Sequence, residues 1–164
     1  WGRPVTDDTK LYEKLCLEGF QAGLSWLTIL RKREAFRAAF KDFDPIKVAR
    51  FNDKNIERLM NNEGIVRNRA KIEATIGNAK ATLRVQQEVG SLSKLIWSFA
   101  PIKPGKAPKT FGDLPASTPE SHALSKELLK RGFKFVGPTT MYAAMQSLGL
   151  VNDHFANCHA RHTA

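Results

Sequence analysis

Apolar side chains recur at intervals of three and four residues along most of this chain, whereas no segment alternates apolar and polar residues as a half-buried strand would. Residue types that begin and end helices separate the periodic segments. Ser25 suits the N-terminal cap of a helix, and Pro45 suits the first helical residue after such a cap. Gly64 and Gly90 suit a left-handed C-terminal cap. The pattern predicts an all-α protein.

The chain has 164 residues, enough for one domain with a buried core and too few to favour two. We therefore expect a single domain over residues 1–164. The stretch from Pro101 to Pro115 is the longest irregular segment, and we expect it to be a mobile surface connection. The second helix should direct four apolar side chains inward, namely Leu27, Leu30, Phe36 and Phe40. The expected helices begin near residues 8, 25, 45, 53, 67, 91, 119 and 138.

The formal net charge of +10 favours a polyanionic partner, most simply nucleic acid. Ribosomal, histone-like and many housekeeping proteins share such a charge, so the charge alone does not establish a nucleic-acid partner. No apolar run is long enough to span a bilayer, and no membrane partner is expected. The two cysteines, Cys16 and Cys158, are too few for a disulfide framework and are typical of a reducing cytoplasm, where we expect a monomer.

The segment from Cys16 to Trp26 combines one carboxylate, two glycines and an indole between two expected helices. Glu18 falls on the last turn of the first helix, and Gly19 and Gly23 then allow the backbone to turn and approach another molecule closely. Trp26 follows in the first turn of the next helix. A carboxylate and an indole at such a corner suit the recognition of a flat, partly cationic ring. From these residues alone, an ordinary helical corner with a surface Glu and a core Trp is the alternative.

Two expected helices nearer the C-terminus are joined by a short segment that begins with Gly132 and ends with Gly137. This arrangement is typical of a helix-hairpin-helix DNA-binding element, which we expect over about residues 119–149. Free backbone N–H groups at the start of the second helix would bind a phosphate, aided by the helix dipole and nearby cations. The candidate residues are Lys134, Gly137 and Thr139. A glycine-containing corner with no DNA-binding role is the alternative.

His154 and Cys158 are four positions apart, so on a helix or turn their side chains would lie on one side and suit half of a tetrahedral zinc site. A second pair of ligands is not evident. Cys16 belongs to the core stripe of the first helix, and His159 and His162 lie in the tail. On spacing alone, an accidental pair is the alternative.

Several sequence blocks occur together and in order: Leu17-Glu18-Gly19, Gln21 to Trp26, Gly64 to Arg67, Trp97 to Phe99, Ser125-Lys126, Arg131 to Gly137, and Gly149 to His154. Through them the chain resembles the bacterial 3-methyladenine DNA glycosylase I family over residues 1–158. The resemblance implies a helix-hairpin-helix glycosylase fold. It also implies a bacterial, cytoplasmic DNA-repair hydrolase that removes 3-methyladenine from alkylated double-stranded DNA without an organic cofactor.

Carried over by position, the resemblance implies roles for individual residues. Glu18 would be the catalytic carboxylate that hydrogen-bonds the edge of the flipped base. Trp26 would stack on the face of that base, and Trp1 would line the pocket. Gly23 and Leu24 match the loop that approaches the gap left by the flipped nucleotide.

The resemblance also implies a structural zinc ion, because His154 and Cys158 match two of the four ligands of the family. The family has a segment before the position of Trp1 that supplies the other two, a Cys and a His, together with a pocket tyrosine. We therefore expect an incomplete zinc site in this sequence. A stable but inactive family member is one alternative.

The chemistry of the base agrees with the resemblance. Methylation at N3 makes adenine a cation in DNA, and its departure as neutral 3-methyladenine makes it a good leaving group; both Glu18 and Trp26 favour a cationic base. Related glycosylases use an Asp where this chain has Asn152 followed by Asp153, and the lyase members use a lysine where it has Thr139. We therefore expect a monofunctional glycosylase with water as the nucleophile. A non-catalytic helix-hairpin-helix DNA-binding module is the main alternative.

Overall fold

The computed structural model describes residues 1–103 and 105–162, and within these ranges the secondary structure consists of helices with no strand. Residue 104 of the expected irregular stretch and residues 163–164 of the expected domain lie outside the described residues. None of the described helices is long and apolar enough to cross a bilayer. The elements are α1 (Asp8–Gln21), α2 (Trp26–Ala39), η1 (Lys41–Phe43), α3 (Pro45–Val48), α4 (Asp53–Met60), α5 (Arg69–Val89), α6 (Leu92–Trp97), η2 (Phe111–Asp113), α7 (Pro119–Lys130), α8 (Pro138–Ser147) and η3 (His159–His162).

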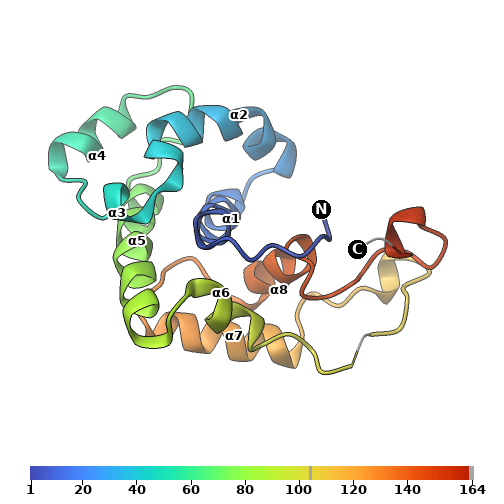
Figure 1. Ribbon diagram of the computed structural model, residues 1–164. Helices are drawn as coiled ribbons and strands as arrows, with labels where there is room; N and C mark the ends of the chain where they lie inside the picture. Colours follow the sequence, from blue (N-terminus) through green and yellow to red (C-terminus); the bar gives the residue numbers. More distant parts are fainter. Residues whose placement is uncertain (104, 163–164) are drawn as a thin grey trace.

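Helix α1 lies at the centre of the fold (Figure 1). Helices α2, α3 and α4 lie on one side of it and α6, α7 and α8 on the other, while the long α5 runs along the edge that joins the two groups. Helix α1 contacts α2, α5, α6 and α8. Its side chains Leu11, Tyr12, Leu15 and Phe20 are almost fully buried, and each such burial stabilises the fold by about 2 kcal/mol. Packing from both sides therefore fixes the position of residues on α1.

Side-chain caps begin the helices that shape the site. Ser25, the predicted cap of α2, accepts a hydrogen bond from the N–H of Thr28 at 3.2 Å. Asn68 and Ser91 cap α5 and α6 in the same way. Each cap of this kind stabilises a helix by about 1 kcal/mol. Gly90 ends α5 with a φ of 100°, as the sequence predicts.

Two other glycines allow close packing and do not adopt the predicted conformations. Gly64 does not adopt a positive φ, and a Cβ at this position would lie 2.9 Å from the Cβ of Ala35. Gly19 lies inside α1, where a Cβ would approach the Cβ of Phe135 to 3.0 Å. The predictions of a left-handed cap at Gly64 and of a turn at Gly19 were wrong, because either an unusual φ or a close neighbour can require the missing Cβ of a glycine.

The orientation of α2 also differs in part from the expectation. Phe36 and Phe40 are buried as predicted, whereas Leu27 and Leu30 are each 56% exposed. Ile29 takes the inward position in this part of α2, and this turns the neighbouring leucines outward. Leu30 consequently lines a cavity instead of the core.

The first residues of the chain run along the C-terminal end of α8, near which Figure 1 places the N-terminus. The N–H of Gly2 donates to the carbonyl of Ser147 at 3.1 Å, and the N–H of Val5 donates to the carbonyl of Leu148 at 3.1 Å. These bonds hold Trp1 next to α8.

The connection between α6 and α7 lies against the C-terminal segment of the chain. The ring of Phe111 in η2 meets the ring of Phe155 edge to face, with centroids 5.0 Å apart. The N–H of Ala156 donates to the carbonyl of Pro108 at 2.9 Å. Mobility of this connection stays a prediction.

Candidate functional site

A cavity of about 690 Å³ opens between the N-terminal residues and helices α1, α2 and α8. Helix α1 contributes Glu18, α2 contributes Trp26, and Trp1 comes from the N-terminal segment. The structure therefore brings together the carboxylate and the two indoles that the sequence singles out. This size and mixture of aromatic and polar groups suit a small flat ligand.

Glu18 is the buried carboxylate that lines this cavity. Its residue is 1% exposed, and neither carboxylate oxygen accepts a hydrogen bond within the described part of the chain. Lys14 Nζ lies 2.8 Å from Glu18 Oε1, so the two form an ion pair. Burial raises the pKa of Glu18, and the neighbouring Lys14 charge partly opposes that rise. A buried acceptor of this kind is costly to leave unpaired, so it is suited to a ligand that donates hydrogen bonds.

The two indoles differ in their surroundings. Trp26 is half-buried in the first turn of α2, and Lys14 Nζ lies 4.0 Å from the centroid of its ring. Trp1 is 64% exposed and meets the ring of His154 edge to face, with centroids 4.8 Å apart. Both indoles line the cavity, but Trp26 is partly buried in its wall, whereas Trp1 is mostly exposed to solvent.

The two arginines that line the cavity are bound to a different carboxylate. Arg33 Nε and Arg37 Nε both donate to Glu13 Oε1, at 2.8 and 2.9 Å. Burial alone would raise the pKa of Glu13, but the hydrogen bonds from the two guanidinium groups outweigh it and lower that pKa. Glu13 is therefore a structural anion that ties α1 to α2, whereas Glu18 faces the cavity and is paired with Lys14.

The corner between α1 and α2 is held in one conformation by contacts from α5. Gly23 has a φ of 82°, so this glycine does turn the chain as predicted. Lys71 Nζ donates to the carbonyls of Phe20 at 2.9 Å and of Ala22 at 2.6 Å. Leu24, next in the corner, is 39% exposed. Gly23 and Leu24 are therefore exposed to solvent next to backbone that Lys71 holds in place.

The hairpin between α7 and α8 is anchored to the same helix. Asn78 on α5 exchanges two hydrogen bonds with the backbone of Lys134, at 2.8 and 3.1 Å. The side chains of Lys134 and Thr139 are exposed. Gly137 precedes Pro138 at the start of α8, and a Cβ there would meet no atom within 4 Å. The predicted phosphate-binding residues therefore lie together at an open helix N-terminus, and their contact with DNA stays a prediction.

His154 and Cys158 come together as their spacing predicts, in irregular chain and not on a helix. Cys158 Sγ lies 3.7 Å from His154 Nδ1. Among residues 1–103 and 105–162, no group of three or more His, Cys, Asp and Glu side chains is arranged to hold a metal. A structural zinc ion takes four ligands, so the described residues do not fit a complete zinc site. Zinc binding stays a prediction.

The pair Asn152 and Asp153 lies outside the lining of the cavity. Asp153 Oδ2 accepts hydrogen bonds from Tyr142 Oη at 2.5 Å and from Gln146 Nε2 at 2.9 Å. Asn152 Nδ2 donates to the carbonyl of Arg161 at 2.9 Å. Both side chains therefore support the end of α8 and the tail.

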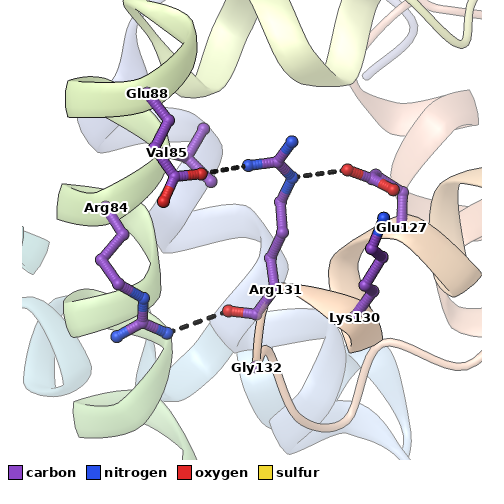
Figure 2. A pocket seen from close by; sticks show the side chains of 7 residues that line it. All are labelled: Arg84, Val85, Glu88, Glu127, Lys130, Arg131 and Gly132. Carbon is purple, nitrogen blue, oxygen red and sulfur yellow. Dashed lines mark hydrogen bonds and ion pairs between the residues drawn. The ribbon is translucent and has the colours of Figure 1, made fainter.

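A second cavity, of about 480 Å³, lies between α5 and α7 (Figure 2). Figure 2 shows Arg131 between two carboxylates: Nη1 donates to Glu88 Oε2 at 2.8 Å and Nε donates to Glu127 Oε1 at 2.6 Å. Arg84 Nη2 donates to the backbone carbonyl of Arg131 at 2.9 Å. These charges are paired with one another, and this cavity lacks a buried carboxylate such as Glu18 in the first one.

Three residues of the site were missed by sequence reasoning. Lys14 had a usable signal, because a lysine four positions before a glutamate on a helix forms an ion pair. Lys71 and Asn78 had none, since their partners are backbone atoms of segments about fifty residues distant in the sequence.

Comparison with known proteins identifies relatives over almost the whole chain. The family model described as methyladenine glycosylase matches residues 1–162. A protein named DNA-3-methyladenine glycosylase 1 from Escherichia coli (strain K12) is 52% identical over 159 residues, which cover 96% of this chain and 85% of the relative. DNA-3-methyladenine glycosylase from Haemophilus influenzae is 51% identical over 160 residues, which cover 96% and 86% of the two chains.

Solved structures agree with the sequence relatives. A crystal structure of 3-methyladenine DNA glycosylase I superposes with a TM-score of 0.93 at 51% identity and covers 97% of this chain and 88% of the other. A structure that addresses 3-methyladenine recognition by the enzyme from Staphylococcus aureus gives a TM-score of 0.93 at 40% identity, with 98% and 86% of the chains covered.

Proposed function

This chain belongs to the methyladenine glycosylase family, and we propose that its cavity of about 690 Å³ holds a methylated base flipped out of DNA. The chain is a DNA-repair glycosylase that hydrolyses the N-glycosidic bond of 3-methyladenine. The substrate in this proposal is alkylated double-stranded DNA, and the enzyme acts as a monomer.

The buried carboxylate of Glu18, whose close partner among the described residues is the Lys14 ammonium, is the observation that carries the assignment of the cavity. Its two buried oxygens suit the hydrogen-bond donors at the edge of an adenine, and its charge suits a base made cationic by methylation. The face of Trp26 adds a cation–π attraction of up to about 2 kcal/mol when water is excluded. Flipping the nucleotide costs a few kcal/mol, least where damage already weakens stacking, so these contacts offset the flipping cost selectively for the methylated base.

The reaction relies on the lability of the substrate more than on an array of catalytic groups. As the C1′–N9 bond breaks, its electron pair stays on the base, which leaves as neutral 3-methyladenine; water adds hydroxide to C1′ and releases a proton to solvent. Glu18 is the one carboxylate among the described residues that line the cavity. Asn152 and Asp153 lie outside it, so in this proposal neither activates the water. The enzyme remains monofunctional, with water as the nucleophile.

The DNA backbone in this proposal is held by the hairpin and by the corner between α1 and α2. The open N-terminus of α8 at Gly137, with Thr139 and the cationic Lys134 nearby, supports phosphate binding. Gly23 and Leu24 face the gap that the flipped nucleotide leaves. The arrangement supports a helix-hairpin-helix mode of binding, and the net charge of +10 favours it.

Release of free 3-methyladenine from methylated duplex DNA tests the function. We expect Glu18→Gln to lower kcat/KM by about tenfold to a hundredfold, because a charge-assisted contact to the base becomes a neutral one. Glu63→Gln is the matched control, since the Glu63 side chain is 87% exposed. A parent protein that binds methylated DNA without releasing the base would instead be a non-catalytic DNA-binding module. Equal rates for parent and Glu18→Gln would exclude Glu18 from the base site.

A further inference from the structure

Lys14 already makes the two contacts that the proposed function assigns to the base. It lies four residues before Glu18 on α1. Its ammonium nitrogen is 2.8 Å from Glu18 Oε1 and 4.0 Å from the centroid of the Trp26 ring. A carboxylate and an indole face are also the two groups expected to bind a cationic methylated adenine.

The other cations that line the cavity are not arranged to replace Lys14. Arg33 and Arg37 are both bound to Glu13. Lys10, one turn earlier on α1, lines the cavity but makes no ion pair with Glu18 within the described part of the chain. Lys14 is therefore the cation that balances the charge of Glu18 in the free protein.

We propose that Lys14 is a displaceable cation of the base pocket, which leaves Glu18 and Trp26 when the cationic base enters and returns to them when the neutral product is to be released. This inference rests on the proposed function and assigns the control of product release within the same site. Lysine suits the task because its ammonium is carried on a flexible four-carbon stem. The Lys14 side chain is 20% exposed, so solvent is within its reach.

The base loses its positive charge during the reaction, and this loss determines whether the base or Lys14 occupies the site beside Glu18. When the substrate base enters, one cation replaces another at Glu18, and the buried carboxylate stays balanced. After the C1′–N9 bond breaks with its electron pair on the base, the product is neutral and leaves that carboxylate without a counter-charge. Return of the Lys14 ammonium restores the balance and competes with the product for the indole face. Substrate is thereby retained better than product.

The affinity for free 3-methyladenine, measured without DNA, tests the exchange. Lys14→Met keeps the length of the side chain and removes its charge. We expect it to bind the neutral base about tenfold more tightly than the parent does, because no ion pair or cation–π contact has to be broken first. Lys14→Arg keeps a cation and should stay near the parent. Lys10→Met removes the same charge from the same cavity, and its affinity for the base should also match that of the parent.

A second readout separates this inference from the proposed function. In excision assays on methylated duplex DNA, added 3-methyladenine should inhibit Lys14→Met more strongly than the parent. If the parent excises the base but Lys14→Met binds free 3-methyladenine no more tightly, the Lys14 inference is wrong and the proposed function stands. If the parent neither excises nor binds the base, both fail. Lys14→Gln provides the same comparison should Lys14→Met not fold.

Discussion

At the scale of single residues, two glutamates five residues apart on α1 have opposite environments. Glu13 receives hydrogen bonds from Arg33 and Arg37, which lower its pKa despite its burial. Glu18, five residues later, receives none within the described part of the chain, and burial raises its pKa. The same residue type thus serves as a structural anion at one position and lines the cavity at the other, where we propose that it binds the base.

The raised pKa of Glu18 predicts the pH dependence of excision. Only the ionised carboxylate attracts a cationic base, so activity should fall as the pH drops through a pKa that lies above the usual range for glutamate. Lys14→Met removes the cation that opposes this rise, and the acid limb of its kcat/KM profile should move to still higher pH. Lys10, Arg33 and Arg37 also face the cavity and are common to both proteins. Profiles of the two proteins measure the difference; an acid limb that moves to lower pH would contradict this account.

At the scale of elements, α5 connects the two segments proposed to face DNA. Lys71 holds the corner that follows α1, and Asn78 holds the hairpin that precedes α8. The two anchors lie on one helix, seven residues apart in the sequence, or about two turns. Helix α5 therefore fixes the distance between the corner and the hairpin, the two segments that we propose to contact DNA.

Removing the anchor of the corner should weaken both folding and function. Lys71→Met leaves the carbonyls of Phe20 and Ala22 without their donor. The expected loss in the free energy of unfolding is about 1–3 kcal/mol, accompanied by slower excision because Gly23 and Leu24 lose their support. Urea unfolding and the release of 3-methyladenine measure the two effects.

Lys80→Met provides the comparison for the corner, since Lys80 is exposed on the same helix. It should keep the stability and the excision rate of the parent. If Lys71→Met keeps both as well, α5 does not position the corner.

The sequence predicted where helices begin and end better than it predicted which side of each helix is buried. Local rules located the caps of Ser25 and Ser91 and the stop at Gly90, because each depends on a few adjacent residues. The inward direction of Leu27 and Leu30 was wrong, because the position of α2 against α1 decides which stripe is buried. That position depends on tertiary contacts which periodicity alone does not specify.

At the scale of the whole molecule, the candidate cavity is built from segments far apart in the sequence. Trp1 belongs to the N-terminal segment, Glu18 to α1, Trp26 to α2 and Gln146 to α8. The family resemblance predicted the first three of these residues. It did not predict that Lys14 would occupy the space between Glu18 and Trp26, since that depends on the rotamer of one side chain and on the distance between two helices.

The binding of free 3-methyladenine, followed through the indole N–H signals in NMR spectra, tests the central claim about this cavity most directly. The chain has three tryptophans, so each signal reports one place. We expect the signals of Trp26 and Trp1 to shift on titration. The signal of Trp97, whose indole nitrogen donates to the carbonyl of Val5 at 2.9 Å, should shift less. In the Glu18→Gln variant, the same shifts should require a higher concentration of 3-methyladenine than in the parent. Shifts confined to Trp97, or no shift of Trp26 at saturation with the base, would contradict a base site between Glu18 and Trp26.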